Sequence, residues 1–261
     1  MTIDTSGFTL GSNQPLNHAR ILWAPVTGAV TASAGTNGDY AANDYTAQRW
    51  TLAAGANTWT LVTTVNSLVD CCFIAAHNLM GKTVLIQTAE TVGGAFTTRA
   101  TIIPSDNSAI CALFNNAGTA YTVREVRISV SDGTDITIGI IRFGVALQLP
   151  RPIYGGHGVI QFNRITEAQQ QFSETGQWLG RTIKRQAITS SYAWQHVTAT
   201  WYSTYFDSFA ATLPLAPFGI AGNPSKMPKD VAWGMVNTDI RVSNMGILNY
   251  VSFDMEVVGL A

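Results

Sequence analysis

Short hydrophobic runs alternate with polar turns along the first half of the chain. The segment 57–62 has period two, which places Trp59 and Leu61 on one face of a strand. Gly93-Gly94, Asn115-Asn116 and Asp132-Gly133 supply turn residues between such runs. Many short strands with regular turns are typical of a β-sandwich or jelly roll. We expect strands in the segments 20–23, 26–34, 57–62, 68–76, 83–87, 110–114, 121–130 and 136–147.

One run, from Leu68 to Ala76, is continuously apolar. Such a run predicts a strand that is covered on both faces. Cys71 and Cys72 are neighbours within it, so their side chains should point to opposite faces and should not bond to each other. We therefore expect these two residues and Cys111 to be buried free thiols.

The alternation slips within 121–130. Tyr121 and Val123 share one phase, whereas Val126, Ile128 and Val130 share the other. A β-bulge near Arg124 and Glu125 would reconcile the two registers.

A seam rich in proline and glycine, residues 149–158, separates this half from the rest. Beyond it, strands are expected at 159–165, 215–220, 230–235 and 250–257, with two β-prone stretches within 182–194. The period changes to that of an amphipathic helix over about 196–213, where the apolar stripe is Trp201, Tyr205, Phe209 and Leu213. We predict two domains, residues 1–149 and 150–261, in a mainly β chain with one helix.

Composition narrows the function. The chain is 46% hydrophobic and only 12% charged, which favours extensive contact with other subunits. The net charge is −1, and neither half is the basic body that phosphate neutralisation requires, so nucleic acid is not expected as the main partner. The dense basic cluster of Arg181, Lys184 and Arg185 is interpreted as a solvated strand edge or a subunit contact, in preference to a nucleic-acid patch. Neither a signal peptide nor an apolar run long enough to span a membrane is recognised.

The sequence nominates no catalytic residues. The four histidines, His18, His77, His157 and His196, lie in no metal or nucleophile motif. We interpret His77 as a hydrogen-bonded residue at a strand end and His157 as a turn residue of the seam. The carboxylate pair Glu167 and Glu174 is interpreted as solvated. We therefore expect no enzyme, no cofactor and no metal.

Binding stays open at this stage. Tyr40, Trp50 and Trp59 are the aromatic residues from which a glycan site could be built, although apolar strands follow both tryptophans and favour core positions for them. Oxygen ligands for calcium occur in Asp39, Asn43 and Asp44. An acid-rich loop without metal is the commoner alternative.

The order of features in the first half resembles the discoidin-like, or coagulation-factor type C, β-sandwich. The likeness is carried by Arg49-Trp50 at the end of a polar loop, by 74–78, and by 121–128. The whole chain also resembles structural proteins of tailed bacteriophage virions, through 151–157, 176–181 and 239–246. Its second half is similar to the β module with one helix of tail-tube and distal-tail proteins.

This resemblance implies a structural component of the virion tail, at the distal tail or baseplate. It implies copies that form a ring around the tail axis, as a hexamer or trimer, with other tail proteins as neighbours and assembly in the host cytoplasm. The cysteine pattern lacks the disulfide of many extracellular discoidin-type domains, which fits a reducing compartment. Two alternatives remain: a module that binds host-surface carbohydrate and, less favoured, a tail-associated hydrolase.

Overall fold

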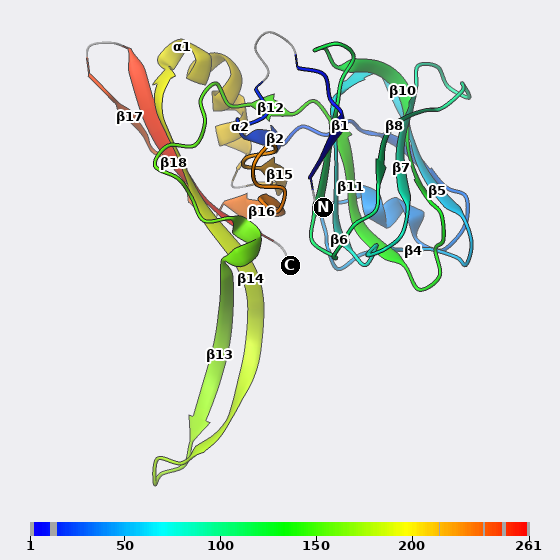
Figure 1. Cartoon of the computed structure of the whole chain (residues 1–261). Coiled ribbons are helices and arrows are strands. Elements are labelled where there is room, and N and C mark those ends of the chain that lie inside the picture. The colour runs from blue at the N-terminus through cyan, green and yellow to red at the C-terminus, as the bar shows by residue number, and fades with distance from the viewer. Residues whose placement is uncertain (1–2, 11–14, 214, 237, 247–248, 260–261) are drawn as a thin grey trace.

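The computed structural model describes residues 3–10, 15–213, 215–236, 238–246 and 249–259. The chain is mainly β and forms two modules that lie side by side, with a long hairpin extending from one of them (Figure 1). The first module is a β-sandwich, and the second is a large antiparallel sheet covered by a short helical segment. Both the mainly β class and the sandwich agree with the prediction.

Two five-stranded sheets build the sandwich. The strands β1 and β9 pair in parallel, and every other described pair within the two sheets is antiparallel. A short 3₁₀ helix, η1 (Gly38–Ala42), covers one end. In spatial order, the first sheet is β1 (Ile3–Gly7), β9 (Ile110–Phe114), β6 (Cys71–His77), β11 (Thr137–Gly144) and β4 (Trp50–Thr51), and the second is β3 (Gly28–Ala32), β5 (Asn57–Val69), β10 (Tyr121–Val130), β7 (Val84–Ala89) and β8 (Thr97–Ile102).

The first sheet is buried on both faces. Cys72 and Ile74 of β6 point into the core between the two sheets, whereas Cys71 and Phe73 point outward into a second core. This second core, which we call the joint core, joins the two modules through Phe73, Leu113, Ile140, Leu22, Val231 and Trp233. The continuous apolar run of β6 is therefore explained as predicted, by a strand that is covered on both faces. All three cysteines are free and buried, as expected.

The register of β10 breaks at the predicted place. Val123 faces Ser67 of β5 but Glu125 faces Val62, so the additional residues lie on β5. The Arg124 guanidinium holds the irregular segment by donating to the Thr63 carbonyl oxygen at 3.0 Å. The bulge thus turns Val126, Ile128 and Val130 into the sandwich core.

The third sheet has eight strands and crosses the predicted seam. Two of its strands, β2 and β12, come from before residue 150, and they pair with each other through Ile21 and Leu147. In spatial order the sheet is β12 (Leu147–Gln148), β2 (Arg20–Leu22), β15 (Phe218–Ala221), β16 (Val231–Val236), β18 (Tyr250–Gly259), β14 (Trp178–Thr198) and β13 (Arg164–Phe172), with β17 (Val242–Asn244) paired to β18.

The predicted helix is present, but its buried face is different. It consists of α1 (Ala199–Trp201), a π-helical stretch η3 (Tyr202–Phe206) and α2 (Asp207–Thr212). The wider π turn shifts the register by one position, so Phe206 is buried and Tyr205 is exposed. The expected stripe was wrong at Tyr205, whereas Phe209 and Leu213 are buried as predicted.

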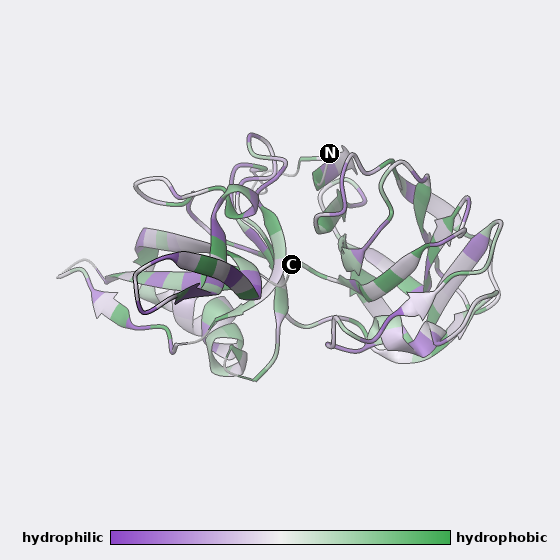
Figure 2. Ribbon diagram, turned by 90° about the horizontal axis from the view of Figure 1, so that it is seen from below, coloured by the Kyte–Doolittle hydropathy of each residue, from purple (hydrophilic) through white to green (hydrophobic). Residues whose placement is uncertain are grey.

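The hairpin that leaves the third sheet consists of β13 and residues 178–186 of β14, and we call it the arm. The sequence predicted a strand at 159–165, but a short 3₁₀ turn, η2 (Ile160–Phe162), precedes β13 instead. Every residue of β13 is exposed. In the view from below, the arm points out of the main body, and hydrophobic residues concentrate on the strands of the two modules (Figure 2).

Candidate functional site

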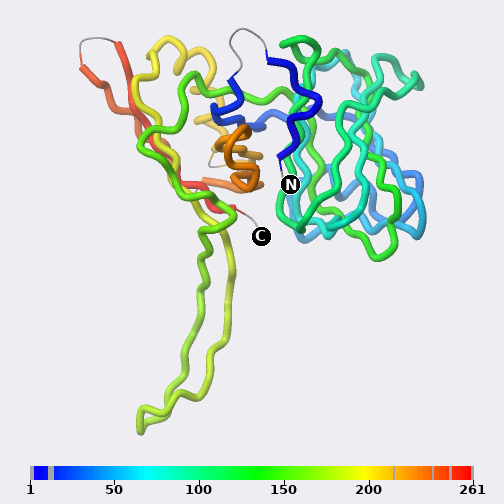
Figure 3. The backbone as a smooth tube through the Cα atoms, viewed as in Figure 1, coloured from blue at the N-terminus to red at the C-terminus, as the bar shows by residue number. Residues whose placement is uncertain are grey.

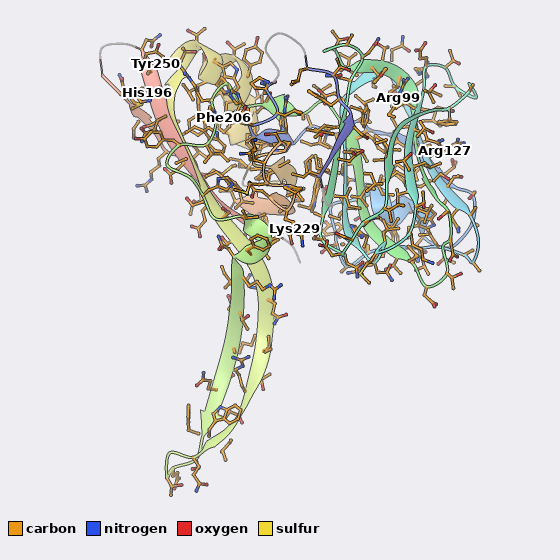
Figure 4. The ribbon with its side chains drawn as sticks, in the orientation of Figure 1. Arg99, Arg127, His196, Phe206, Lys229 and Tyr250 are labelled. Atoms are coloured by element: carbon orange, nitrogen blue, oxygen red, sulfur yellow. The ribbon has the colours of Figure 1, made fainter. Side chains whose placement is uncertain are left out.

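A cleft of about 480 Å³ opens between the two modules, beside the base of the arm. The sandwich contributes residues at the ends of first-sheet strands and in the loop before β9. The second module contributes η2, the start of β13 and Lys229, which Figure 4 labels near the junction. The polar and charged groups that carry the argument are Arg49, His77, Asp106, Asn107, Arg164 and Lys229.

His77, the last residue of β6, forms the inner wall of the cleft. Ala76 before it has a φ of 52°, a conformation that is uncommon outside glycine and that redirects the strand end. The His77 ring is 5% exposed, and its Nδ1 accepts a hydrogen bond from the Leu79 backbone N–H at 3.2 Å. The strand-end, hydrogen-bonded interpretation of His77 is confirmed.

The second ring nitrogen of His77 lacks a good partner. Nε2 is buried beside the Ser108 backbone without a well-formed hydrogen bond. Burial lowers the pKa of His77 to about 4, although the Ser108 backbone and Asp106 act in the opposite direction. The ring is therefore neutral near pH 7. Because Nδ1 accepts a hydrogen bond, the proton belongs on Nε2, which lies beside the Ser108 backbone.

The charges around His77 are mostly positive. Lys229 forms an ion pair with Asp106 at 3.2 Å. Burial acts to raise the pKa of Asp106, but hydrogen bonds from Ser108 and Lys229 outweigh burial and leave that pKa lowered, so the carboxylate is charged. Arg49 and Arg164 add two further cations, both exposed. Three cations thus face one carboxylate in a chain whose net charge is −1.

The cleft offers both hydrogen-bond donors and acceptors next to an aromatic ring. Phe162 of η2 lines it and is 68% exposed. The Ser108 hydroxyl bonds to Asp106 rather than to His77, so the nucleophile–base pairing of hydrolases does not form at this serine. Among the described residues, no group of three or more His, Cys, Asp or Glu side chains is placed to hold a metal ion.

The aromatic residues nominated for glycan binding lie elsewhere. Trp50 and Trp59 have 0% exposure and belong to the sandwich core. Their indole N–H groups donate to the carbonyl oxygens of Ala34 and Gly38 at 3.1 and 2.8 Å. A buried ring presents no face to a sugar, so these two tryptophans are core residues, as the alternative interpretation had it. Tyr40, in η1, is partly exposed and does not line the cleft.

The loop nominated for calcium is occupied by protein contacts. The Asp44 carboxylate pairs with the buried Arg142 guanidinium at 2.9 Å. Asn43 accepts from the Tyr45 backbone N–H through its side-chain oxygen. These bonds engage one oxygen each of Asp44 and Asn43, and whether the loop takes calcium together with Asp39 stays a prediction.

The basic cluster Arg181, Lys184 and Arg185 lies on the arm, and all three side chains are exposed. Arg185 pairs with Glu167 of β13 at 2.8 Å, which gives that acid a partner on the neighbouring strand. Whether the cluster contacts another subunit stays a prediction.

His157 makes a contact that the sequence did not reveal. Its Nε2 pairs with Asp230, a carboxylate with 0% exposure that also accepts from the Tyr192 hydroxyl at 3.1 Å and the Ile160 N–H at 3.2 Å. The prediction of a turn role was incomplete, because the side chain fastens the seam to the third sheet. Asp230 is 73 positions away in sequence, so no local pattern could pair the two.

Comparison with known proteins shows the fold and no more. Neither a family model nor a curated protein matches the chain. A chitosan-binding module from a Paenibacillus chitosanase/glucanase is 20% identical, with a TM-score of 0.39 over 46% of this chain and 96% of the module. CBM62 of Clostridium thermocellum Xyl5A is 17% identical, with a TM-score of 0.39 over 48% and 99%. The family 32 module of C. perfringens NanJ, solved with galactose, is 13% identical, with a TM-score of 0.38 over 44% and 91%.

The chain therefore has β-sandwich neighbours of the discoidin and carbohydrate-binding-module type. These matches give no support to the virion assignment, which stays a prediction. Because all three TM-scores lie below 0.5, the function has to be argued from the cleft. In the part of the chain that the structure describes, no helix is long and apolar enough to cross a membrane.

Proposed function

We propose that this chain is a carbohydrate-binding protein whose ligand occupies the cleft between the two modules. The observation that carries the proposal is the gathering of three cations, an amide and a carboxylate around an exposed aromatic ring in one cleft.

A sugar suits this set of groups better than other small ligands do. Sugar hydroxyls both donate and accept, and the cleft supplies cations, an amide and a carboxylate for them. The exposed Phe162 ring adds an apolar face of the kind that packs on sugar C–H groups. The cavity volume lies within the roughly 300–1,000 Å³ of typical small-ligand sites, which is room for one to a few sugar rings.

Binding to a saccharide array, followed by calorimetry on the hits, tests the proposal with the full chain. Galactose and chitotriose, the ligands of two structural neighbours, are the first probes beside acidic saccharides. We expect His77→Asn to weaken binding at least tenfold, because the shorter side chain no longer forms the inner wall of the cleft. His196→Asn is the matched control, since His196 lies in the second module away from the junction (Figure 4).

His77→Asn changes a buried residue, so loss of binding in that variant has to be separated from loss of folding. Arg49→Gln is the second cleft variant that serves this purpose. Arg49 is exposed at the rim, so its loss leaves the core intact while it removes one donor from the cleft. Absence of binding by the native chain to every saccharide tested refutes the proposal. Unchanged affinity in both cleft variants refutes the location.

A second function, that of a structural component in an assembly of copies, is favoured by the arm. In an isolated molecule, an exposed two-stranded hairpin is marginally stable at best, and its large apolar side chains stay in contact with water. A virion tail is the assembly that the resemblance implies. Native mass measurement tests self-association, and a chain that stays monomeric at high concentration speaks against it.

A further inference from the structure

Among the described residues, no layer packs against the arm. The strand β13 makes its extensive contacts with β14, and the two strands leave the body together (Figure 3). Two-stranded hairpins are at best marginally stable in water. The arm is therefore a surface that needs a partner, and its apolar side chains indicate where the partner binds.

The apolar side chains gather on one face near the tip. Phe172 lies opposite Trp178, and Ala168 lies opposite Ile183, so cross-strand pairing puts these side chains on the same face, with the pair of Gln170 and Arg181 between them. Phe172 and Trp178 are 57% and 65% exposed. The other face carries the ion pair of Glu167 with Arg185.

A shallow groove of about 650 Å³ lies at the opposite end of the second module, next to α1 and β12 (Figure 1). Exposed apolar groups line it, including Val145 at 43% and Tyr205 at 56%. Its lining carries no carboxylate or permanent cation among the described residues, and His18 is neutral because burial lowers its pKa. The residues that form it are Pro15, His18, Val145, Ala146, Leu147, Gln148, Pro150, Trp201 and Tyr205.

Charge at the rim matches charge at the tip. Arg151 follows the groove residue Pro150 and lies close enough to His18 to influence its pKa. The tip, residues 172–180, carries one ionisable side chain, Glu174, and Arg181 follows directly after it. The acid at the turn of the arm, Glu174, is thus complementary to the base at the rim of the groove, Arg151.

We propose that the tip of the arm of one copy docks into the groove of a second copy, with Trp178 as the main anchor. A chain cannot fill its own groove, because the arm extends from the end of the second module opposite β12 and α1, whose residues line the groove (Figure 1). This contact is head to tail, so repeated copies form a closed ring or an open filament. The inference rests on the assembly function proposed above and names its two surfaces.

Mixing two assembly-deficient variants tests the pairing. Trp178→Ala removes the anchor, and we expect association to weaken at least about 30-fold, as for a central hot-spot residue. Val145→Arg blocks the groove. Each variant alone should be monomeric by analytical ultracentrifugation, whereas an equimolar mixture should form a dimer, because one intact tip meets one intact groove.

Exposed residues on the sandwich provide matched controls. Met80→Ala and Val65→Arg change similarly exposed side chains away from both surfaces and should leave assembly unchanged. Glu174→Arg should weaken association, and combining it with Arg151→Glu should restore association by reversing the pair.

Three results overturn the inference. If the native chain is monomeric, the assembly function fails as well. If the native chain assembles but Val145→Arg has no effect, the arm pairs with something other than the groove, while the assembly function stands. If the mixture of the two variants stays monomeric although each variant is folded, tip and groove are not complementary.

Discussion

The sandwich and the arm are both made of antiparallel strands, but they use apolar side chains in opposite ways. Trp59 of β5 has 0% exposure, whereas Trp178 at the arm tip is 65% exposed. In the sandwich, two sheets bury each other's apolar faces, and the joint core buries the outer face of the first sheet as well. The arm has the same pattern of strand pairing without a second layer. The comparison teaches that strand pairing alone does not provide a core, so the arm leaves in solvent the apolar side chains that a second layer would bury.

The largest effect is expected where a side chain serves both modules. Phe73 lies in the joint core with 0% exposure, and its ring contacts Gly219 of β15 closely. Phe73→Ala should lower the free energy of unfolding by about 3–5 kcal/mol, because it removes buried area and leaves a cavity. Trp178→Ala, measured under monomeric conditions, should change it by less than about 0.5 kcal/mol. Chemical denaturation measures both, and similar losses would remove the contrast between the two regions.

An effect of intermediate size is expected from Asp70 and His77, two buried residues of the sandwich. Acidification changes the free energy of unfolding in opposite directions through these two residues. Burial raises the pKa of Asp70 to about 6, and burial lowers the pKa of His77 to about 4. The folded state takes up the Asp70 proton more readily than the unfolded state does, so this residue favours folding as the pH falls from 6 to about 4. The folded state takes up the His77 proton less readily, so stability is lost as the pH falls from 6.5 to 4.

Each contribution is at most about 3 kcal/mol, and the two nearly cancel in the native chain. Asp70→Asn should therefore make the protein lose stability on acidification between pH 6.5 and 4 relative to the native chain. His77→Gln should do the reverse. Denaturant titrations at several pH values measure the slopes, and identical slopes in the native chain and both variants would show that neither group titrates as described.

The smallest effect is expected from the charges of the arm. Glu167 and Arg185 form an ion pair whose side chains are 53% and 59% exposed. Solvent screens such pairs, so Glu167→Gln should change the free energy of unfolding by no more than about 0.5 kcal/mol. Thermal melts at low and high salt give this value. A larger loss in the monomer would mean that the arm is stabilised internally and has less need of a partner.

The parts of the fold that could be predicted are those in which burial leaves a periodic trace. Alternation located β10 and its irregular register, and an unbroken apolar run located β6 with its two covered faces. The arm left no such trace, because strands that are exposed on both faces need no alternation. The π turn of the helix could not be predicted either. Its wider turn places Phe206 on the buried face, and this shift leaves no mark in the composition.

The candidate site was beyond reach for a different reason. His77 stood out as a strand-end histidine, and Arg49 as the end of a polar loop, but the cleft needs both next to Phe162 and Lys229 of the other module. That juxtaposition depends on the joint core, which is a product of long-range packing. The sequence pointed instead to Trp50 and Trp59, whose position beside apolar strands made them stand out. They lie beside apolar strands because both belong to the buried core.

The way in which the chain passes between the modules has a mechanical consequence. It runs from β1 in the sandwich to β2 in the third sheet, returns to the sandwich, and leaves it through β12, which pairs with β2. The chain therefore crosses between the two modules several times, so that more than one covalent connection links them. A force applied to the arm would be transmitted along β14 into the third sheet and from there directly into the sandwich. The whole molecule would therefore move as one rigid body.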